Sequence, residues 1–258
     1  MIQLKPREQS QLETTPTQNT KEKLNKTKGT PVNSNVSHWI TPIIYFLGRR
    51  VLMPFYFGKL KVTGQENIPR TGPVILAPTH RSRWDGLLIP YAAGKPITGR
   101  DLRFMVTADE CEGLQGWFIR SMGGFPVDTK HPGISSIRHS VELLCQEEAL
   151  VMFPEGDIFR DGQLHPLKPG LARIALQVES SHPGSDLKIV PIGICYSQPL
   201  PHWGCQVEVK IGSPLKVASY SHNSAKKNSQ QLTQDLEIAL RQLTEETKKA
   251  EVESATTP

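Results

Sequence analysis

The sequence has few cysteines and none of the short motifs that mark several common classes of protein. Its 258 residues include four cysteines, and no two of them have the C-x-x-C spacing of a zinc site. They are too few and too scattered for a disulfide framework, which favours a reducing compartment. The chain has no G-x-S-x-G, Walker lysine or G-x-G-x-x-G motif, so a hydrolase serine elbow and a nucleotide-binding loop lack support. We expect neither a metal site nor a resident cofactor.

Neither positive nor negative charge dominates the sequence, because 30 Lys and Arg against 25 Asp and Glu leave a net charge of only +5. Residues 1–35 supply most of this excess and contain no aromatic residue. A nucleic-acid-binding protein would concentrate basic and aromatic residues on a folded face, so we expect no nucleic-acid partner. The tail 1–35 is too polar to bury a core and is predicted to be disordered. It lacks the apolar stretch of a secretory signal peptide; a weak tether to anionic lipid is the alternative to a simply solvated tail.

Long hydrophobic runs are missing as well. The segment 36–60 carries six of the 17 aromatic residues, but Arg49 and Arg50 divide it into two short apolar runs. A membrane-spanning helix needs about 20 mainly apolar residues, and two central arginines would be costly in a bilayer. Aromatic and basic residues together suit a lipid–water interface, so we expect an amphipathic helical segment that binds the cytoplasmic side of a membrane peripherally. An ordinary core helix or helix pair is the alternative. The predicted membrane contacts are Trp39, Phe46, Arg49, Arg50, Phe55 and Phe57.

Residues 61–220 alternate between two kinds of segment. Apolar, β-rich runs occur at 74–77, 102–107, 125–127, 150–153, 189–195 and 207–211, and helical patterns at 84–93, 113–121, 134–147 and 168–180. This alternation predicts an α/β domain with a mixed, largely parallel sheet flanked by helices. Residues 221–258 are predicted to form a linker and an amphipathic C-terminal helix of about four turns, with a stripe formed by Leu232, Leu236, Leu240 and Leu243.

The strongest site signal follows the first of these apolar runs. His80 comes directly after it, and Asp85 lies five residues later. Five residues of regular helix turn about 500°, so the two side chains would not share a helix face. They can meet if His80 lies in a strand-to-helix turn and Asp85 in the first turn of the helix. A carboxylate beside an imidazole fixes its tautomer, and the other nitrogen can accept a proton from a hydroxyl. A local capping role for His80 is the alternative.

Three further segments have turn chemistry at strand ends. Glu155 and Gly156 follow an apolar strand and Pro154, and a glycine turn leads from Gly123 into another strand. Pro191 interrupts the strand 189–195, and proline within a strand indicates an edge or a bulge. Each feature alone has a local structural explanation, but their order and spacing together are more specific.

In this order the four segments resemble the blocks of the glycerolipid acyltransferase family, whose best-known members are lysophosphatidic acid acyltransferases. The resemblance covers roughly 60–215, with His80-x4-Asp85 as the first block, Gly123 to Asp128 as the second, 153–156 as the third and 190–192 as the fourth. It implies that the histidine is a general base and that the aspartate orients it. It also implies an acyl donor that is a thioester on CoA or acyl carrier protein.

The chain departs from the family pattern where arginines associated with the acceptor's phosphate would stand. Thr129 ends the second block, and Ile158 occupies the other position. Thr79 precedes His80, where the family often has asparagine. Nearby cations could restore the charge, although lysine lacks the planar fork that grips phosphate. The residues predicted to hold the acceptor are Glu155, Gly156, Arg160, Lys130, Arg81 and Arg83. Holding the loop is the alternative for Glu155, and solvated surface charge is the alternative for the two arginines beside His80.

We therefore expect a membrane-surface O-acyltransferase that acylates a lysophospholipid, with 1-acyl-glycerol-3-phosphate as the favoured acceptor and phosphatidic acid as the product. One alternative is an acyltransferase for a less charged lysolipid. Another is a lipid-binding protein that kept the fold and lost catalysis. The acyl chain length, the choice between CoA and acyl carrier protein, and the oligomeric state stay open.

Overall fold

The computed structural model describes residues 36, 39–111, 113–127 and 134–256. Within these ranges eight strands form one sheet in the order β1-β7-β6-β2-β5-β3-β4, and β8 pairs with β6. Neighbouring strands are parallel except at β6–β7 and β6–β8. The predicted mixed, largely parallel sheet is therefore present. The strands are β1 (Lys59–Thr63), β2 (Val74–Pro78), β3 (Leu102–Thr107), β4 (Gly124–Val127), β5 (Ala149–Val151), β6 (Lys188–Tyr196), β7 (Gln206–Ile211) and β8 (Leu215–Lys216).

All six predicted strands and all four predicted helices of the central region are present. The helices are α4 (Asp85–Ala93), α6 (Gly113–Ser121), α7 (Ile134–Cys145) and α8 (Gly170–Ser181). The sequence did not predict β1, β8 or the short helix α5 (Lys95–Thr98). Strand β1 has an exposed lysine at alternate positions, Lys59 and Lys61. Lysine on an edge strand opposes pairing with another chain. Here the two lysines also interrupt the apolar pattern, so the strand was not recognised in the sequence.

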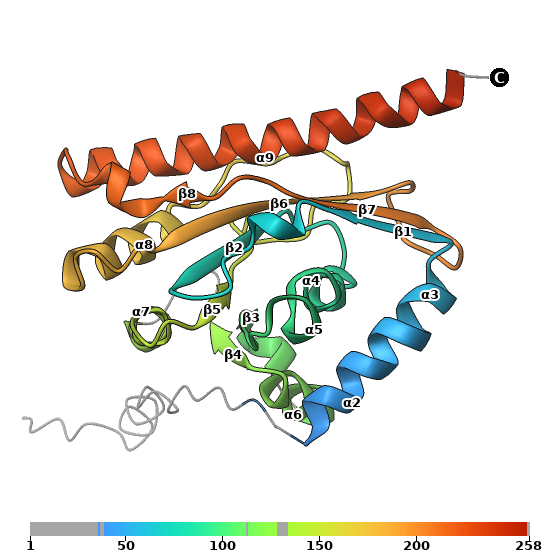
Figure 1. The fold of residues 1–258 in the computed structure, drawn as a ribbon, viewed down its shortest axis with the longest axis horizontal. Coiled ribbons are helices and arrows are strands. Elements are labelled where there is room, and N and C mark those ends of the chain that lie inside the picture. Colours follow the sequence, from blue (N-terminus) through green and yellow to red (C-terminus); the bar gives the residue numbers. More distant parts are fainter. Residues whose placement is uncertain (1–35, 37–38, 112, 128–133, 257–258) are drawn as a thin grey trace, which may run out of the picture. The chain divides into compact units, whose positions relative to one another are not determined.

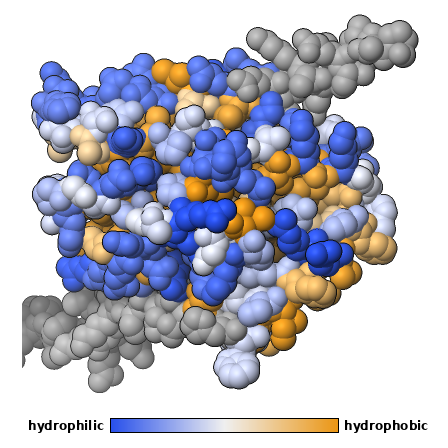
Figure 2. Space-filling model, viewed as in Figure 1, coloured by the Kyte–Doolittle hydropathy of each residue, from blue (hydrophilic) through white to orange (hydrophobic). Residues whose placement is uncertain are grey.

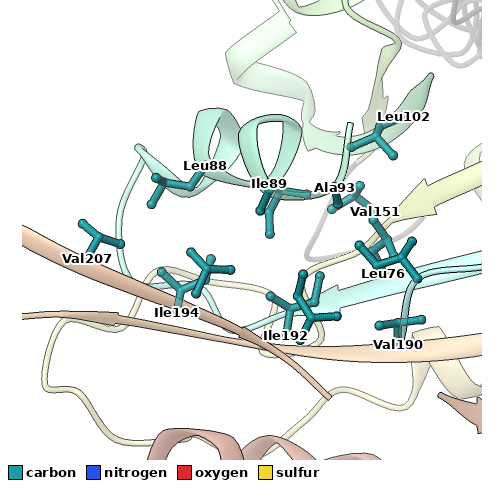
Figure 3. Packing of buried hydrophobic residues seen from close by; sticks show 14 of the residues in the cluster. Leu76, Leu88, Ile89, Ala93, Leu102, Val151, Val190, Ile192, Ile194 and Val207 are labelled. Carbon is teal, nitrogen blue, oxygen red and sulfur yellow. The ribbon is translucent and has the colours of Figure 1, made fainter. Parts of the chain in front are cut away.

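Two layers of side chains cover the faces of the sheet. On one face, α4 packs against apolar residues of β2, β6 and β7. Figure 3 shows Leu88 and Ile89 of α4 facing Ile192 and Ile194 of β6. On the other face, α7, α8 and the C-terminal helix α9 (Ala225–Thr256) pack against Ile75 of β2, Leu150 of β5 and Ile189 of β6. Figure 1 shows α9 running along one face of the sheet and α4 on the other. The strands β2, β5 and β6 are thus buried on both faces, as is usual for parallel strands.

Proline at position 191 does not lie at an edge, as the sequence suggested. It lies within β6, a central strand between β2 and β7. On the side of β6 away from β2, residues 188–189 pair with β8 and residues 192–196 pair with β7. The carbonyl of Pro191 accepts a hydrogen bond from Gly212 on that side. The missing N–H therefore falls where the partner strand changes, and no ladder hydrogen bond is lost there.

The N-terminal segment is helical from residue 40 to residue 56, as α2 (Ile40–Leu47), η2 (Gly48–Leu52) and α3 (Met53–Tyr56). One side of it packs against the body of the protein. Arg49 donates a hydrogen bond to the carbonyl of Tyr91, and a side chain at Gly94 would collide with the ring of Tyr45. Met53 and Phe57 enter the core beneath α4. No helix in the described part of the chain is both long enough and apolar enough to cross a membrane.

The C-terminal helix is longer than predicted, because α9 extends over 32 residues where the leucine stripe indicated about four turns. Leu232, Leu236 and Leu240 are buried, and Leu243 lies against Gly193 and Gly212 of the sheet region. The stripe therefore marks only the part of the helix that packs on the sheet. Residues beyond it, such as Glu246, Lys248 and Ala250, are good helix formers, so the helix continues without an apolar face.

Candidate active site

The candidate site forms where three neighbouring parallel strands end. Strands β2, β5 and β6 run in the same direction, so their carboxyl ends lie at one edge of the sheet. His80 follows β2, Glu155 follows β5, and Tyr196 is the last residue of β6. Crevices outside the carboxyl ends of strands are the usual binding sites of α/β sheets. The topology thus brings together residues that are up to 116 positions apart in the sequence.

His80 and Asp85 meet as their spacing predicted. His80 lies in the turn after β2, and Asp85 is the first residue of α4. The distance from His80 Nδ1 to Asp85 Oδ2 is 3.0 Å. An ionised carboxylate can only accept hydrogen bonds, so Nδ1 carries the proton and Nε2 is the nitrogen that can accept one. This is the arrangement required of a general base.

Asp85 is fully buried, and hydrogen bonds hold its carboxylate on both oxygens. Oδ2 accepts from the backbone N–H groups of Arg81 at 2.6 Å and Ser82 at 2.8 Å. Oδ1 accepts from the hydroxyl of Tyr196 at 2.6 Å. A buried carboxylate without such donors would tend to take up a proton. These donors therefore compensate for the burial of the carboxylate and aim Oδ2 at His80.

The ring of His80 stacks on Phe153, with centroids 3.9 Å apart and planes inclined by 21°. Its side chain keeps 19% of its exposure, so the imidazole is accessible from one side. Phe153 lies in the third block, two residues before Glu155. The flat contact limits rotation of the ring about χ2, and together with Asp85 it fixes the direction of Nε2.

Glu155 holds the loop, one of the two roles predicted for it, and does not line an open acceptor site. Its side chain is fully buried, and its two oxygens accept from the backbone N–H groups of His80 and His165 and from Arg81 Nη1. The distance from Arg81 Nη1 to Glu155 Oε2 is 2.8 Å. Both members of this ion pair therefore support the turn that carries His80. Arg81 Nη2 is buried and has no hydrogen-bond partner among the described residues.

The loop that follows Glu155 closes over this ion pair. Phe159 donates its backbone N–H to the carbonyl of His80, and Lys168 donates its own to the carbonyl of Pro154. Asp161 accepts from His165 Nε2 at 2.7 Å. A backbone hydrogen bond from Gln163, followed by the one from His165, lowers the pKa of Asp161. The loop is thereby joined to the histidine turn at its start and to itself at its tip.

The remaining predicted acceptor contacts lie in different surroundings. Arg83 is exposed and pairs with Glu110 at 2.6 Å. Arg160 is exposed and follows Phe159, whose N–H binds the turn of His80. Gly156 has a φ of 71°, a backbone conformation that favours glycine, so its place in the block is explained by the turn. Lys130 and Thr129 lie outside the described residues.

Two residues at this edge of the sheet were missed by the sequence analysis. Tyr196 was excluded because the predicted strand ended one residue earlier, although a hydroxyl at the carboxyl end of a strand was a usable signal. Lys168 has its Nζ 3.4 Å from the carbonyl of Gly156 and is exposed. It adds a second cation to the loop between β5 and α8, which also carries Glu155 and Arg160.

Among the predicted membrane contacts, the structure separates exposed from buried residues. Trp39, Phe46 and Phe55 have exposed fractions of 88%, 66% and 66%, and Arg50 is also exposed. Phe57, by contrast, is 3% exposed and packs in the core, so its assignment to the membrane was wrong. It follows the end of the helix, where the chain turns inward to begin β1.

Comparison with known proteins gives one matching family and several relatives. A family model described as Acyltransferase matches residues 59–195, rather more than half of the chain, and Tyr196 lies one residue beyond this match. The chain is 28% identical over 194 residues to a 1-acyl-sn-glycerol-3-phosphate acyltransferase of Bacillus subtilis, covering 72% of this chain and 88% of the relative. A Streptococcus pneumoniae protein of the same name is 27% identical over 150 residues, covering 56% of this chain and 50% of the relative.

A more distant relative and a solved structure complete the comparison. Mitochondrial glycerol-3-phosphate acyltransferase 1 of mouse is 29% identical over 166 residues, which are 57% of this chain and 19% of the mouse protein. The crystal structure of the 1-acyl-sn-glycerophosphate acyltransferase PlsC from Thermotoga maritima superposes with a TM-score of 0.63 at 21% identity. The superposition covers 81% of this chain and 80% of that one, so the two proteins share a fold.

Proposed function

Because this chain belongs to the acyltransferase family, we propose that it transfers a fatty acyl group from a thioester to the hydroxyl of a lysophospholipid. The observation that carries the proposal is the contact between His80 and the buried Asp85, which leaves His80 Nε2 to act as the base. The favoured acceptor is 1-acyl-glycerol-3-phosphate, and the product is then phosphatidic acid. This is also the acceptor named for the B. subtilis relative.

The proposed reaction needs only groups that this chain and its two substrates supply. His80 Nε2 takes the proton of the acceptor hydroxyl while that oxygen attacks the thioester carbonyl carbon. Asp85 stabilises the imidazolium that forms. When the tetrahedral intermediate collapses, the carbon–sulfur bond breaks and the imidazolium returns its proton to the leaving thiolate. The products are an ester and a free thiol. Acyl-CoA and acyl carrier protein both fit this chemistry, so we propose a thioester co-substrate and no further cofactor.

Recognition of an acceptor phosphate rests on the exposed cations of the loop after Glu155. Arg81 binds Glu155 through Nη1, and Arg83 pairs with Glu110. On that loop Arg160 and Lys168 are exposed cations, and Lys130, outside the described residues, remains a further candidate. Charge-assisted hydrogen bonds are the strongest means of holding a phosphate. The engagement of Arg81 and Arg83 also favours a second candidate, a less charged lysolipid acceptor, and the two candidates are distinguished by experiment.

We also propose that the helical segment 40–56 holds the enzyme on a membrane surface, where its acceptor resides. Figure 2 shows apolar surface gathered at the lower right of the view, where Figure 1 draws α2 and α3. Residues 36–60 contain three basic and no acidic side chains, which favours an anionic surface. The exposed apolar residues of the segment are Trp39, Ile43, Phe46, Leu47, Val51, Leu52 and Phe55.

The test is acceptor-dependent release of thiol from a thioester by the purified protein. We expect turnover of acyl-CoA, or of acyl carrier protein in a parallel arm, to require an added lysolipid and to be faster with lysophosphatidate than with uncharged monoacylglycerol. The variant Arg160→Ala should raise KM for lysophosphatidate about tenfold, the size of one charge-assisted hydrogen bond, and leave KM for the donor unchanged. Arg241→Ala, on α9, where Arg241 pairs with Glu237 at 2.8 Å, is the control.

Two results would contradict parts of this proposal. Thiol release that is independent of any acceptor in both donor arms would contradict acyl transfer to a lipid. Faster turnover of monoacylglycerol, with KM for lysophosphatidate unaffected by Arg160→Ala, would reject the phosphate acceptor and support the less charged one.

A further inference from the structure

We propose that Tyr196 is a positioning residue, whose hydroxyl holds Asp85 in the orientation that it needs to act on His80. The inference deepens the proposed function and rests on it, since it assumes that His80 is the base. Tyr196 lies 111 positions after Asp85, beyond the segments that carry the resemblance to the family. It would make the catalytic pair a chain of three: tyrosine, aspartate and histidine.

The hydrogen bonds of Asp85 divide between its two oxygens. Oδ2 accepts from His80 Nδ1 and from two backbone N–H groups. On Oδ1 the donor, among the described residues, is the Tyr196 hydroxyl, at 2.6 Å. This distance is typical of an O–H donor to a charged carboxylate. Because Asp85 is 0% exposed, water does not take the place of this donor at the surface. Tyr196 therefore determines how the second oxygen is held.

The fold keeps the hydroxyl in place and in its donating form. Tyr196 ends β6, where its Cα pairs with Val207 of β7, and its ring lies 6.3 Å from that of Phe57. Burial, and next the charge of Asp85, raises the pKa of Tyr196 well above its usual range. The hydroxyl thus keeps its proton in neutral solution and can donate it to Oδ1.

The charged and titratable groups around the pair indicate what loss of this donor would do. Asp85 faces His80 and Tyr196, while the guanidinium of Arg81 is turned to Glu155 and does not touch Asp85 in any described contact. Cys205 lies near Tyr196. Without the hydroxyl, the carboxylate would be stabilised less by neutral donors and would gain more from a protonated His80. His80 would then hold its proton to higher pH, and the free base would be scarcer at neutral pH.

The test compares Tyr196→Phe with Tyr220→Phe in the full chain. Tyr220 also donates to a carboxylate, that of Asp235, at 2.9 Å, but on the α9 side of the sheet, so it is the matched control. The imidazole of His80 is titrated by NMR, with its signals assigned from the His80→Ala spectrum. The pH dependence of kcat and KM is measured with lysophosphatidate and acyl-CoA.

We expect Tyr196→Phe to move the His80 titration midpoint upward and the acidic limb of the kcat profile with it. At neutral pH kcat should fall about tenfold, the loss expected for one hydrogen bond to a charged group, with KM for either substrate unchanged. Tyr220→Phe should change none of these. A midpoint that stays in place or moves down in a folded Tyr196→Phe variant would overturn the proposal, even if kcat fell, because Tyr196 would then serve only the fold.

A second variant keeps the test decisive if Tyr196→Phe does not fold. Replacing Tyr196 by 3-fluorotyrosine keeps its shape and makes the hydroxyl a stronger donor, so the His80 midpoint should move downward; no movement would overturn the proposal. The NMR titration needs no substrate. A protein that shows the expected midpoints but no turnover would therefore contradict the proposed function and not the role of Tyr196.

Discussion

At the scale of single residues, the site depends on a buried ion pair that supports the turn of His80. Glu155 and Arg81 are almost fully buried, and Glu155 accepts the backbone N–H of His80 at 3.0 Å. The desolvation of two charges offsets most of what their attraction gains, but removing one partner leaves the other charge buried and uncompensated. The pair therefore makes the position of the His80 turn sensitive to either residue.

Loss of the Glu155 carboxylate should accordingly be costly. We expect Glu155→Ala to lower the free energy of unfolding by about 3–5 kcal/mol, the range for breaking a buried ion pair, as measured by urea denaturation. The control is Glu110→Ala, because the partner of Glu110 is Arg83, whose side chain is 74% exposed. An exposed pair contributes about 0–1 kcal/mol. Equal effects of the two variants would show that burial of the Glu155 pair has no energetic consequence.

Whether a site residue could be predicted from the sequence depends on how far apart in the chain the residues that it contacts lie. His80 and Asp85 are five positions apart, so a turn and one helical turn were enough to predict their contact. Tyr196 reaches Asp85 only because β6 lies beside β2, and strand order was not readable from the chain. Glu155 was placed at the correct strand end. Its partners, His80 and His165 backbone N–H groups, became visible only when the loop was folded.

At the scale of elements, the helical segment 40–56 has two different faces. Tyr45, Arg49 and Met53 lie against the body of the protein. Phe46 and Phe55 are exposed. The segment is thus a packed helix that also has an exposed apolar surface, and its binding to a membrane stays a prediction. Deleting it would remove Met53 from the core, so membrane binding has to be tested with substitutions on the exposed face alone.

The double variant Phe46→Ser/Phe55→Ser should bind vesicles of phosphatidylcholine and phosphatidylglycerol at least about tenfold less tightly in sedimentation. Burying one phenylalanine away from water is worth about 1.5–3 kcal/mol, and each 1.4 kcal/mol is a factor of ten. Ile238→Ser is the control, since Ile238 is 49% exposed on α9. Unchanged binding of the double variant, or an equal loss with Ile238→Ser, would place the membrane surface elsewhere.

At both ends of the described chain, tertiary contacts determine where a helix or a strand begins and ends. The leucine stripe correctly marked the part of α9 that packs on the sheet, but the rest of the helix has no apolar period to reveal it. At the other end, β1 was absorbed into the N-terminal segment because Lys59 and Lys61 interrupt its apolar pattern. Its parallel pairing with β7 joins residues about 150 positions apart, which local sequence does not encode.

At the scale of the whole molecule, stability should fall in alkaline solution partly through Tyr45. Burial raises the pKa of Tyr45 from 10.0 to about 12. Between these values the unfolded chain has lost this proton and the folded chain keeps it, so the free energy of unfolding decreases as pH rises. One proton changes this slope by about 1.4 kcal/mol per pH unit.

The variant Tyr45→Phe removes the titrating group and keeps the ring. We expect the free energy of unfolding to fall less steeply between pH 10 and 12 in Tyr45→Phe than in the unaltered protein, as measured by urea denaturation at fixed ionic strength. Lysines titrate in the same range, so only the difference between the two slopes is informative. Parallel slopes would mean that Tyr45 is not buried against α4 and α5 in solution.

The central claim is that His80, oriented by Asp85, is the base for acyl transfer, and one measurement tests it most directly. The rate of acceptor-dependent thiol release is compared between the unaltered protein and His80→Ala, with circular dichroism and melting temperature as checks on folding. We predict a loss in kcat of about 10²–10⁴-fold, the usual contribution of a general base, because no other described group contacts Asp85 as His80 does. A folded His80→Ala variant that retains near-normal turnover would contradict the account.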